Sequence, residues 1–441
     1  NTWMRTKFGE SIREYFVTNS NPITLLNFED TQIFPSATVE VNILLTKNEP
    51  WDGKMDAVAI KNDFKITTPI QLYLDKNKIE LSDLSKESWV ILSKEDFKIK
   101  NRISNNAVQL KEWDIEINRG FLTGLNDAFF IDEEKKIELI KEDSNSDFII
   151  KPLVRGREIN KYSYDFNNKY VIFPHNGTKS KPRIEVEKDY PSIYAHLSKW
   201  KDKNAESVKL NNKGVVQTLI DRADQGLHWT NLRNCAYIDS FESEKLIWLS
   251  ISDKPAFSLD IKKTYVTAPA YIMTSKCNKF LMVTLNSKVM EWYLDKVSSS
   301  TGVGTNQWSK IFVEQLPIPM LNEYDIRPFN VIADYLIYLN NPESKELLTV
   351  ESNNHIGDFF EKVANMMVFE LYFSEEMKQQ KVNVLELINF KDISQKEELE
   401  KSDFIIEVYK GLMRKENEIR NRILVSESRC EFIRVINKFS N

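Results

Sequence analysis

Two stretches decide how this chain folds: GFLTGLNDAFFI at residues 120–131 and FIIKPLVRGREINKY at residues 148–162. The first places a Gly-x-x-Thr-Gly-x-Asn turn before an apolar strand, and a short helix is expected after it. The second is an apolar run of buried character that ends in Arg155, Gly156 and Arg157. Two guanidinium groups on either side of a flexible glycine suit the binding of phosphates or of guanine edges. Neither stretch contains a reaction centre.

Further segments of regular character follow in order after these two. Short apolar runs predict strands, and apolar residues at helical spacing predict helices. The expected series is a strand at 170–173, a helix at 190–200, the segment HWTNLR at 228–233, a strand at 245–251, a helix opened by LNSK at 285–288, the segment QWS at 307–309 and LPIP at 316–319.

In this order and at this spacing, the segments resemble the TaqI-like target-recognition (specificity) domain. That domain is attached to adenine-N6 DNA methyltransferases of type II, IIG-like, restriction-modification systems. The LNSK helix and the terminal LPIP are also similar to specificity subunits of type I systems. The resemblance covers about residues 118–320 and rests on several ordered motifs, which makes it more specific than any single match.

The resemblance implies that the chain recognises a sequence in double-stranded DNA and belongs to a phage-defence enzyme. Such an enzyme binds S-adenosylmethionine, and Mg²⁺ as well where it carries a nuclease domain. We expect this chain to be a fragment that binds no cofactor or metal itself and has no catalytic residues. Its expected partners are double-stranded DNA and a missing N-terminal methyltransferase domain.

The expected fold class is α+β and multidomain. We expect a remnant of a Rossmann-like methyltransferase sheet, a mixed α/β target-recognition domain and a C-terminal helical bundle. The N-terminal unit is predicted from a helix at residues 4–17 and strands at 23–28 and 38–46. The predicted boundaries are 1–50 for the end of the methyltransferase fold, 51–113 for a connecting region, 114–322 for the target-recognition domain and 323–441 for the helical domain.

The C-terminal part has apolar residues at helical spacing almost throughout. One helix is expected to contain residues 332–339, and a second is expected to contain the strongly apolar residues 359–373. A third is predicted at 401–420 and a fourth at 421–439. An aromatic and methionine stripe of this kind is typical of a packed core and does not indicate a cofactor site.

The motifs of an adenine methyltransferase active site do not occur in this sequence. Such an enzyme needs a Gly-rich loop for its cofactor and an Asn/Asp-Pro-Pro-Tyr/Phe loop for the flipped adenine. NPIT at 21–24 and NPES at 341–344 lack the second proline and the aromatic residue. GVG at 302–304 lacks a preceding strand and a third glycine.

Three groups of residues are candidates for DNA contacts. The first group comprises Arg155, Arg157 and Lys161. These residues could bind phosphates or guanine edges, or they could form internal salt bridges instead. The second lies on a proline-containing loop suited to backbone contacts and comprises Lys179, Lys181 and Arg183. The third could reach base edges or could simply connect two elements, and comprises Thr305, Asn306 and Gln307.

Composition is compatible with this interpretation. The chain has 441 residues and a formal net charge of −5, but residues 145–235 carry 16 Lys and Arg against 10 Asp and Glu. A basic region on an acidic chain is sufficient for a DNA-facing surface. The three widely spaced cysteines form no zinc or disulfide framework, and no apolar run approaches the length of a membrane span. We therefore expect a cytoplasmic protein with no membrane partner.

Two other functions compete with DNA recognition. A PD-(D/E)xK nuclease needs acidic residues and a lysine on adjacent strands. Glu133, Glu134 and Lys135 match these residue types. They fall in a charged helical run, which is typical of a solvated face. A helical protein-interaction scaffold, or a helper domain without its own DNA specificity, would account for the C-terminal helices but not for the motifs in the middle of the chain.

Overall fold

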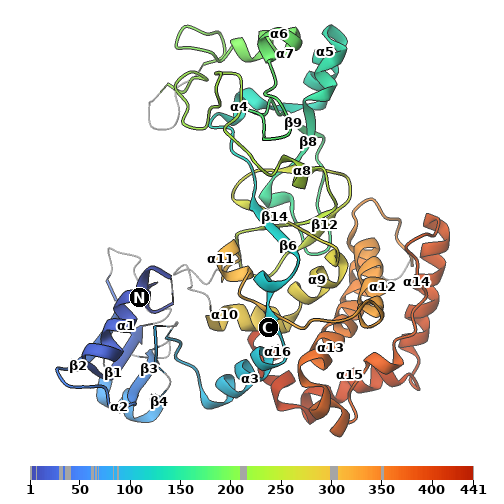
Figure 1. Cartoon of the computed structure of the whole chain (residues 1–441). Coiled ribbons are helices and arrows are strands. Elements are labelled where there is room, and N and C mark those ends of the chain that lie inside the picture. Colours follow the sequence, from blue (N-terminus) through green and yellow to red (C-terminus); the bar gives the residue numbers. More distant parts are fainter. Residues whose placement is uncertain are drawn as a thin grey trace.

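The computed structural model describes residues 2–5, 7–28, 33–34, 41–60, 64, 67, 69–82, 84–86, 89–208, 216–297, 306–348 and 352–440. Several small sheets and a C-terminal set of helices confirm the predicted α+β class. Figure 1 shows an N-terminal sheet on one side, an upper lobe (residues 120–241) above a central sheet, and the C-terminal helices on the other side.

The N-terminal part is a four-stranded sheet of order β2-β1-β3-β4. β1 pairs in parallel with β3, and the outer strands β2 and β4 pair antiparallel to their neighbours. Its core contains Leu25, Met55, Ala57 and Trp89. The elements are α1 (Glu10–Asn19), β1 (Asn21–Phe28), β2 (Val41–Lys47), β3 (Met55–Ile60), α2 (Ile70–Asn77) and β4 (Ile79–Leu81). The predicted connecting region, residues 51–113, therefore supplies two strands of this sheet.

The predicted helix at residues 4–17 is wrong in its first part. The chain forms two 3-10 turns, Thr2–Met4 and Lys7–Gly9, before α1 begins at Glu10. Met4 is buried, and its carbonyl accepts a hydrogen bond of 2.8 Å from the backbone N–H of Trp89. This tertiary contact holds the first turn outside a regular helix. In the strand predicted at 38–46, residues 38–40 lie outside the described residues, and β2 covers the remainder.

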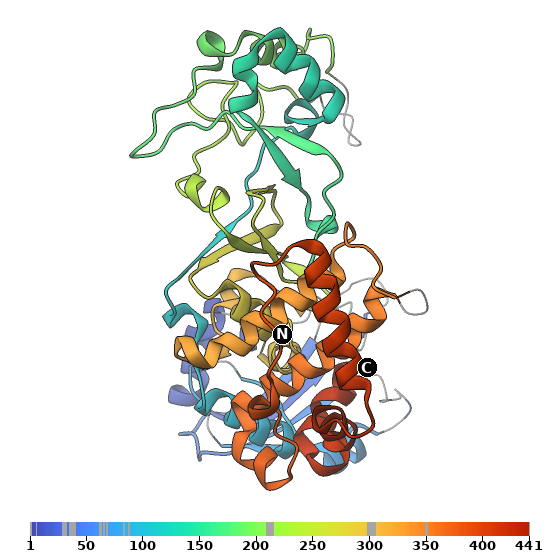
Figure 2. The same ribbon diagram turned by 90° about the vertical axis from the view of Figure 1, so that its right-hand side faces the viewer.

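The upper lobe packs helices against a sheet of order β13-β8-β9-β7. The strand expected at 170–173 and the helix expected at 190–200 are confirmed, as β9 and α7. Figure 2 shows this lobe at the top, with the C-terminal helices below it and toward the viewer. Its elements are α4 (Asn126–Phe129), β7 (Phe130–Asp132), α5 (Glu133–Glu142), η4 (Ser144–Phe148), β8 (Ile150–Val154), η5 (Gly156–Glu158), β9 (Lys169–Ile172), α6 (Val186–Asp189), α7 (Pro191–Ser198) and α8 (Ile238–Phe241), and β13 (Tyr265–Val266) completes its sheet.

Below the lobe lies a second sheet of order β12-β10-β14-β6. Lys245 at the start of β10 pairs in register with Asp260 at the end of β12. Both side chains are fully buried, and the Lys245 Nζ to Asp260 Oδ2 distance is 2.5 Å. The elements of this region are β5 (Val108–Gln109), β6 (Ile115–Arg119), β10 (Lys245–Leu249), β11 (Ile251–Ser252), β12 (Ser258–Asp260), β14 (Ala270–Ser275), α9 (Asn278–Leu285), α10 (Lys288–Val297), β15 (Asn306–Gln307), α11 (Lys310–Val313) and β16 (Pro317–Ile318).

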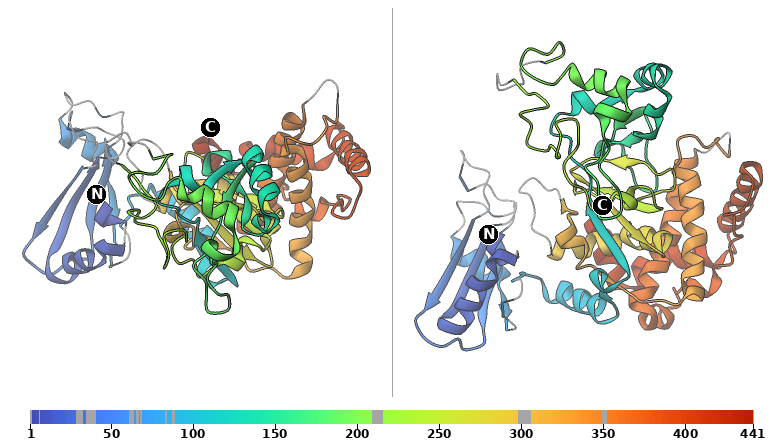
Figure 3. Two further views of the ribbon diagram at one scale, coloured as in Figure 1. Left: turned by 90° about the horizontal axis from the view of Figure 1, so that it is seen from above. Right: turned by 45° about the horizontal axis from the view of Figure 1, so that its top comes forward.

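The C-terminal helices share one large apolar core with α3, α9, α10 and the central sheet. Seen from above in Figure 3, they lie on the opposite side of the molecule from the N-terminal sheet. The long apolar helix expected around residues 359–373 is confirmed as α13. The helices are α3 (Lys94–Asn105), α12 (Glu323–Asn340), α13 (Asn353–Gln379), α14 (Glu398–Met413), α15 (Glu418–Arg429) and α16 (Glu431–Ser440).

The helix predicted at 401–420 is wrong at its C-terminal end. α14 stops at Met413, and Arg414 has an extended backbone. Asn417 then caps a new helix, because its side-chain oxygen accepts a hydrogen bond of 3.0 Å from the N–H of Arg420. The helix predicted at 421–439 is likewise divided into α15 and α16, with Cys430 in an extended conformation between them.

No helix within the described residues is long and apolar enough to cross a membrane. The three cysteines are free thiols. Burial raises the pKa of Cys235 to about 11, which makes its thiol unreactive near neutral pH.

Candidate nucleic-acid interface

The turn after β8 carries the first pair of predicted DNA contacts. Arg155 precedes the 3-10 turn η5, and the buried Glu158 lies at the end of that turn. Glu158 Oε2 accepts a hydrogen bond of 2.7 Å from the N–H of Arg155, and Oε1 accepts one of 2.9 Å from Arg155 Nε. Burial alone would raise the pKa of Glu158, but the hydrogen bonds from Arg155 outweigh it and hold this pKa below its usual value. Arg155 therefore closes the turn.

Gly156 and Arg157 complete this turn in different ways. A Cβ at Gly156 would lie 2.5 Å from Cδ1 of Leu249 on β10, so a larger residue at this position would require the Leu249 side chain to move. Arg157 is exposed, and no acidic partner for it is found in the described part of the chain. Of the two guanidinium groups, Arg157 is the one available to an external ligand, while DNA contact by either stays a prediction.

Lys161 connects the upper lobe to the C-terminal helices. Its Nζ lies 2.5 Å from Oε1 of Glu361 on α13, and both side chains are a little over a quarter exposed. The adjacent Tyr162 is buried and has a left-handed backbone with φ of 66°. The observed contact is the internal salt bridge that the sequence left open as an alternative role for Lys161.

The second group of predicted contacts lies on the loop at residues 175–184, here called the basic loop. The N–H of Thr178 donates to the carbonyl of Lys181 at 2.8 Å, and the N–H of Ile184 donates to the carbonyl of His175 at 3.2 Å. Gly177 has φ of +86°, a left-handed conformation that favours glycine at this turn. The basic loop is therefore a hydrogen-bonded turn with defined geometry.

The three basic side chains of this loop differ in their partners. Lys179 is exposed near the tip. Lys181 forms an ion pair with Asp239. Arg183 lies 2.6 Å from Glu187 Oε1 and donates a hydrogen bond of 2.7 Å to the Asn231 side-chain oxygen. Lys179 is thus the most accessible cation of the group.

The buried Asn231 anchors the basic loop, and the buried Arg222 in turn holds Asn231. Sequence reasoning did not identify the role of either residue. The side-chain amide of the fully buried Asn231 donates to the carbonyl of Ile184 at 2.8 Å. Arg222 is also buried, and it donates to the carbonyl of Thr123 at 2.5 Å and to that of Asn231. Burial lowers the pKa of Arg222 to about 10, so it remains charged at neutral pH. The HWTNLR segment was singled out, but nothing in it indicates a loop anchor.

The third group of predicted contacts is distant from the basic loop in sequence, and its strand pairs with a strand outside the upper lobe. Thr305 lies outside the described residues. Asn306 and Gln307 form β15, which pairs antiparallel with Ile251 and Ser252 of β11. Gln307 is partly buried. Base contact by these residues stays a prediction.

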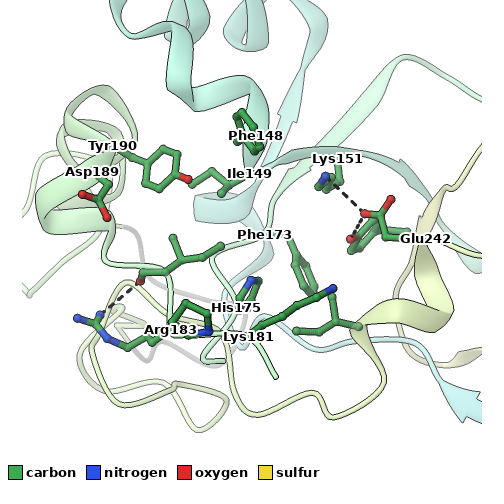
Figure 4. A pocket seen from close by; sticks show the side chains of 14 residues that line it. Phe148, Ile149, Lys151, Phe173, His175, Lys181, Arg183, Asp189, Tyr190 and Glu242 are labelled. Atoms are coloured by element: carbon green, nitrogen blue, oxygen red, sulfur yellow. Dashed lines mark hydrogen bonds and ion pairs between the residues drawn. The ribbon is translucent and has the colours of Figure 1, made fainter. Parts of the chain in front are cut away.

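An open pocket of about 410 Å³ lies beside the basic loop. Figure 4 shows that side chains from the end of η4, from β8, from Phe173 directly after β9, and from the basic loop surround it. The pocket brings together Lys181 and Arg183 but not the residues of the Arg155 turn. The residues that line it are Phe148, Ile149, Lys151, Phe173, His175, Lys181, Pro182, Arg183, Ile184, Asp189, Tyr190, Ile238, Glu242 and Tyr265.

Each lysine and arginine of the pocket is paired with a carboxylate. Lys151 Nζ lies 3.4 Å from Glu242 Oε1, and the Tyr265 hydroxyl donates to the same oxygen at 2.6 Å. Burial alone would raise the pKa of Glu242, but the Tyr265 hydrogen bond and the charge of Lys151 more than offset it and leave the pKa low. Burial, followed by the charges of Lys181 and Lys151, lowers the pKa of His175. His175 is therefore neutral at pH 7, and Glu242 is ionised.

The nuclease alternative receives no support from the arrangement of its residues. Glu133, Glu134 and Lys135 lie in the first turn of α5, which the side chain of Asp132 caps. Lys135 forms a surface ion pair with Glu138 at 2.5 Å. Among the described residues, no three His, Cys, Asp or Glu side chains are grouped so as to hold a metal ion.

Comparison with solved structures finds weak likeness to two restriction enzymes. The type IIL restriction-modification enzyme MmeI, solved in complex with DNA, is 11% identical with a TM-score of 0.48, over 89% of this chain and 46% of that chain. The type IIG restriction endonuclease BpuSI is 13% identical with a TM-score of 0.36, over 84% and 46%. This chain thus spans about half the length of each.

The comparison with protein families concerns the upper lobe and the central sheet. The matched family is described as the TaqI-like C-terminal specificity domain, and the match covers residues 151–318. These residues include the Arg155 turn, the basic loop, most of the pocket lining and β15. The match begins at Lys151 on β8 and ends at Ile318 in the LPIP segment. The part of the chain that carries the Arg155 turn and the basic loop is therefore similar to TaqI-like C-terminal specificity domains.

Proposed function

We propose that this chain recognises a sequence in double-stranded DNA and supplies target choice to a site-specific adenine-N6 DNA methyltransferase of a restriction-modification system. The observation that carries the proposal is the specificity-domain match over residues 151–318. An exposed Arg157 and an exposed Lys179 within that match support it, because phosphate contacts need accessible cations.

The proposed enzyme also contains the remainder of a catalytic methyltransferase domain, which the N-terminal sheet completes and which binds S-adenosylmethionine. Exposed apolar side chains on this unit support a covering partner. Phe8, which precedes α1, is 75% exposed, and Tyr15 on α1 is 58% exposed. Leu45 on β2 is 50% exposed. In the whole enzyme, the specificity domain would hold duplex DNA against the catalytic domain while the target adenine is flipped out.

Selection from a randomised pool of DNA duplexes tests this function. The chain is incubated with the pool at two salt concentrations, and the bound duplexes are sequenced. We expect enrichment of a motif that contains an adenine. Binding should weaken as salt rises, because the entropic gain from releasing cations condensed on the phosphates becomes smaller.

The other outcomes separate the competing functions. Binding that depends on salt but enriches no motif would leave a DNA clamp whose sequence choice needs the catalytic domain. Absence of binding at both salt concentrations would contradict the proposal and favour the helical interaction scaffold. Affinity that is equal at the two salt concentrations would exclude phosphate contacts as the main source of binding.

A further inference from the structure

The pocket beside the basic loop is lined by four aromatic residues together with aliphatic and charged side chains. Figure 4 shows Phe148, Phe173 and Tyr190 around it, with His175 and Lys181 on the side of the basic loop. Its volume of about 410 Å³ falls within the range of roughly 300–1,000 Å³ that is usual for small-molecule sites. None of the DNA contacts predicted from the sequence requires an apolar pocket at this place.

Phe148 is an exposed aromatic side chain on an anchored piece of backbone. The residue is 77% exposed, although Ser146 before it and Ile149 after it are buried. Ser146 Oγ lies 2.7 Å from Ser192 Oγ, and the N–H of Ile149 donates to the Ser146 carbonyl at 3.2 Å. The backbone that carries the ring is therefore anchored beside the pocket. A large apolar ring presented in this way is typical of a binding surface.

The charges of the pocket favour an uncharged planar ligand over a free phosphate. Lys151 is paired with Glu242 at 3.4 Å, Lys181 is paired with Asp239, and Arg183 is paired with a glutamate of α6. Each cation thus has a carboxylate beside it, and little net positive charge is left for a phosphate in the pocket.

Polar groups at the pocket can contact the edge of such a ligand. His175 Nδ1 accepts a hydrogen bond of 3.1 Å from the N–H of Gly177, so the proton of this neutral histidine lies on Nε2, which is a donor. No hydrogen-bond partner of the Tyr190 hydroxyl is found within the described residues. Glu242 offers acceptor oxygens. Aromatic faces with a few donors and acceptors are the combination that binds unstacked nucleobases.

We propose that this pocket receives one unstacked nucleobase of a DNA strand that runs along the basic loop, with Phe148 stacked on the base. Lys179, exposed near the tip of the loop, contacts the backbone of the same strand. The inference rests on the proposed DNA recognition and adds to it a specific step, in which a single base leaves the helix and is read by the specificity domain. Removing a base from the stack costs free energy, which the stacking and hydrogen bonds of the pocket offset.

Phe148→Ala is the first test variant, and Tyr324→Ala is its control. Tyr324 is 81% exposed at the start of α12, outside the matched domain, so both variants remove an exposed aromatic ring. The probe is the duplex enriched in the selection described above, or the random duplex pool where no motif is enriched. We expect Phe148→Ala to weaken binding about 5- to 140-fold, the change that corresponds to ~1–3 kcal/mol for one stacked base. Tyr324→Ala should bind as the wild type does.

Two further measurements separate stacking from a general loss of structure. Phe148→Tyr keeps an aromatic face and should restore binding to within a few-fold of the wild type. A series of duplexes, each with one mismatched pair, should include one position at which the wild type binds more tightly, because an unpaired base leaves the helix at lower cost. That gain should disappear in Phe148→Ala. Equal thermal unfolding midpoints for the wild type and the three variants would show that all four proteins are folded.

The outcomes distinguish this inference from the proposed function. Duplex binding that is the same for Phe148→Ala, Tyr324→Ala and wild type would overturn the pocket while leaving DNA recognition intact. If the wild type binds no duplex, single-stranded homopolymers of each base are tested with the same variants. Binding of a single strand that depends on Phe148 would support the pocket and contradict the duplex function, and no binding of either probe would overturn both.

Discussion

The Arg155 turn and the basic loop each present two or more basic side chains, but they hold them with different partners. Arg155 is bonded to Glu158, a carboxylate that is only 5% exposed and that also accepts from the Arg155 backbone. Lys181 is bonded to Asp239, whose side chain is 73% exposed, and Lys179 is exposed. The first arrangement builds the fold, and the second leaves cations at the surface beside a pocket.

The difference shows that the burial of the acidic partner decides whether a basic residue stabilises the fold or is available to a ligand. A buried carboxylate left without its cation carries a large desolvation cost, whereas an exposed one is solvated by water at little cost. Arg155 and the fully buried Lys245 are therefore fold-holding cations, and Lys179 and Arg157 are cations available to a ligand. Removing one of each kind tests the comparison directly.

The largest effect is expected at Lys245. Lys245→Met leaves Asp260 buried without its cation, although Asp260 still accepts from the Tyr164 hydroxyl at 2.8 Å and from the N–H of Thr264 at 2.8 Å. Loss of one member of a buried pair costs about 3–5 kcal/mol, and we expect a decrease of that size in the free energy of unfolding. Urea denaturation followed by circular dichroism measures it.

Lys262→Met is the matched control for this variant. Lys262 pairs with Glu343 at 3.2 Å, but the two side chains are 56% and 68% exposed. The control should change the free energy of unfolding by no more than about 0.5 kcal/mol. Similar stability losses in the two variants would show that burial of the acidic partner does not control the cost.

An intermediate effect is expected at the Arg155 turn. Arg155→Ala removes charged hydrogen bonds to a buried carboxylate and should lower the free energy of unfolding by about 1.5–3 kcal/mol. Arg157→Ala, two residues away and exposed, should change it by less than about 0.5 kcal/mol. Equal losses in the two variants would contradict the assignment of Arg155 to the fold.

The pH dependence sharpens this contrast. The pKa of Glu158 is lower in the folded chain than in the unfolded chain, where a glutamate titrates near ~4.3. Its contribution to stability is therefore complete above that pH and is lost as pH falls through the folded pKa. The stability difference between wild type and Arg155→Ala should be largest at neutral pH and should shrink below about pH 4. A difference that is constant with pH would mean that Glu158 is not the partner that matters.

The sequence predicted those parts of the fold that local pattern determines. β9 and α7 follow from short apolar runs and helical spacing, and the α+β class follows from the series of such segments. The break between α14 and α15 was missed, because the helical apolar pattern continues across it and only the cap formed by Asn417 interrupts the backbone. The participation of β3 and β4 in the N-terminal sheet was also missed, since strand pairing over long separations is not encoded in local periodicity.

The candidate site was less predictable than the fold. The basic loop could be found from its lysines and proline, but its anchor on Asn231 could not, because the partners are about 50 residues apart in sequence. Phe148 in the sequence looks like the first residue of a buried run. It is exposed because η4 ends at this residue and β8 starts only at Ile150. The orientation of one ring at such a junction depends on tertiary contacts such as that between Ser146 and Ser192.

The smallest effect on stability, and the most informative for function, is expected at Lys179. Lys179→Ala should leave the free energy of unfolding within about 0.5 kcal/mol of the wild type because the side chain is exposed. If Lys179 contacts one phosphate, the slope of log affinity against log salt should become shallower by about 0.9. Titration of labelled duplex at four salt concentrations measures the slope, with Lys98→Ala, at an exposed position on α3, as the control.

The salt slope of Arg155→Ala, measured in the same way, completes the comparison between the Arg155 turn and the basic loop. A cation that only holds the fold leaves the salt slope unchanged, whereas a shallower slope for Arg155→Ala would give Arg155 a phosphate contact in addition to its role in the turn.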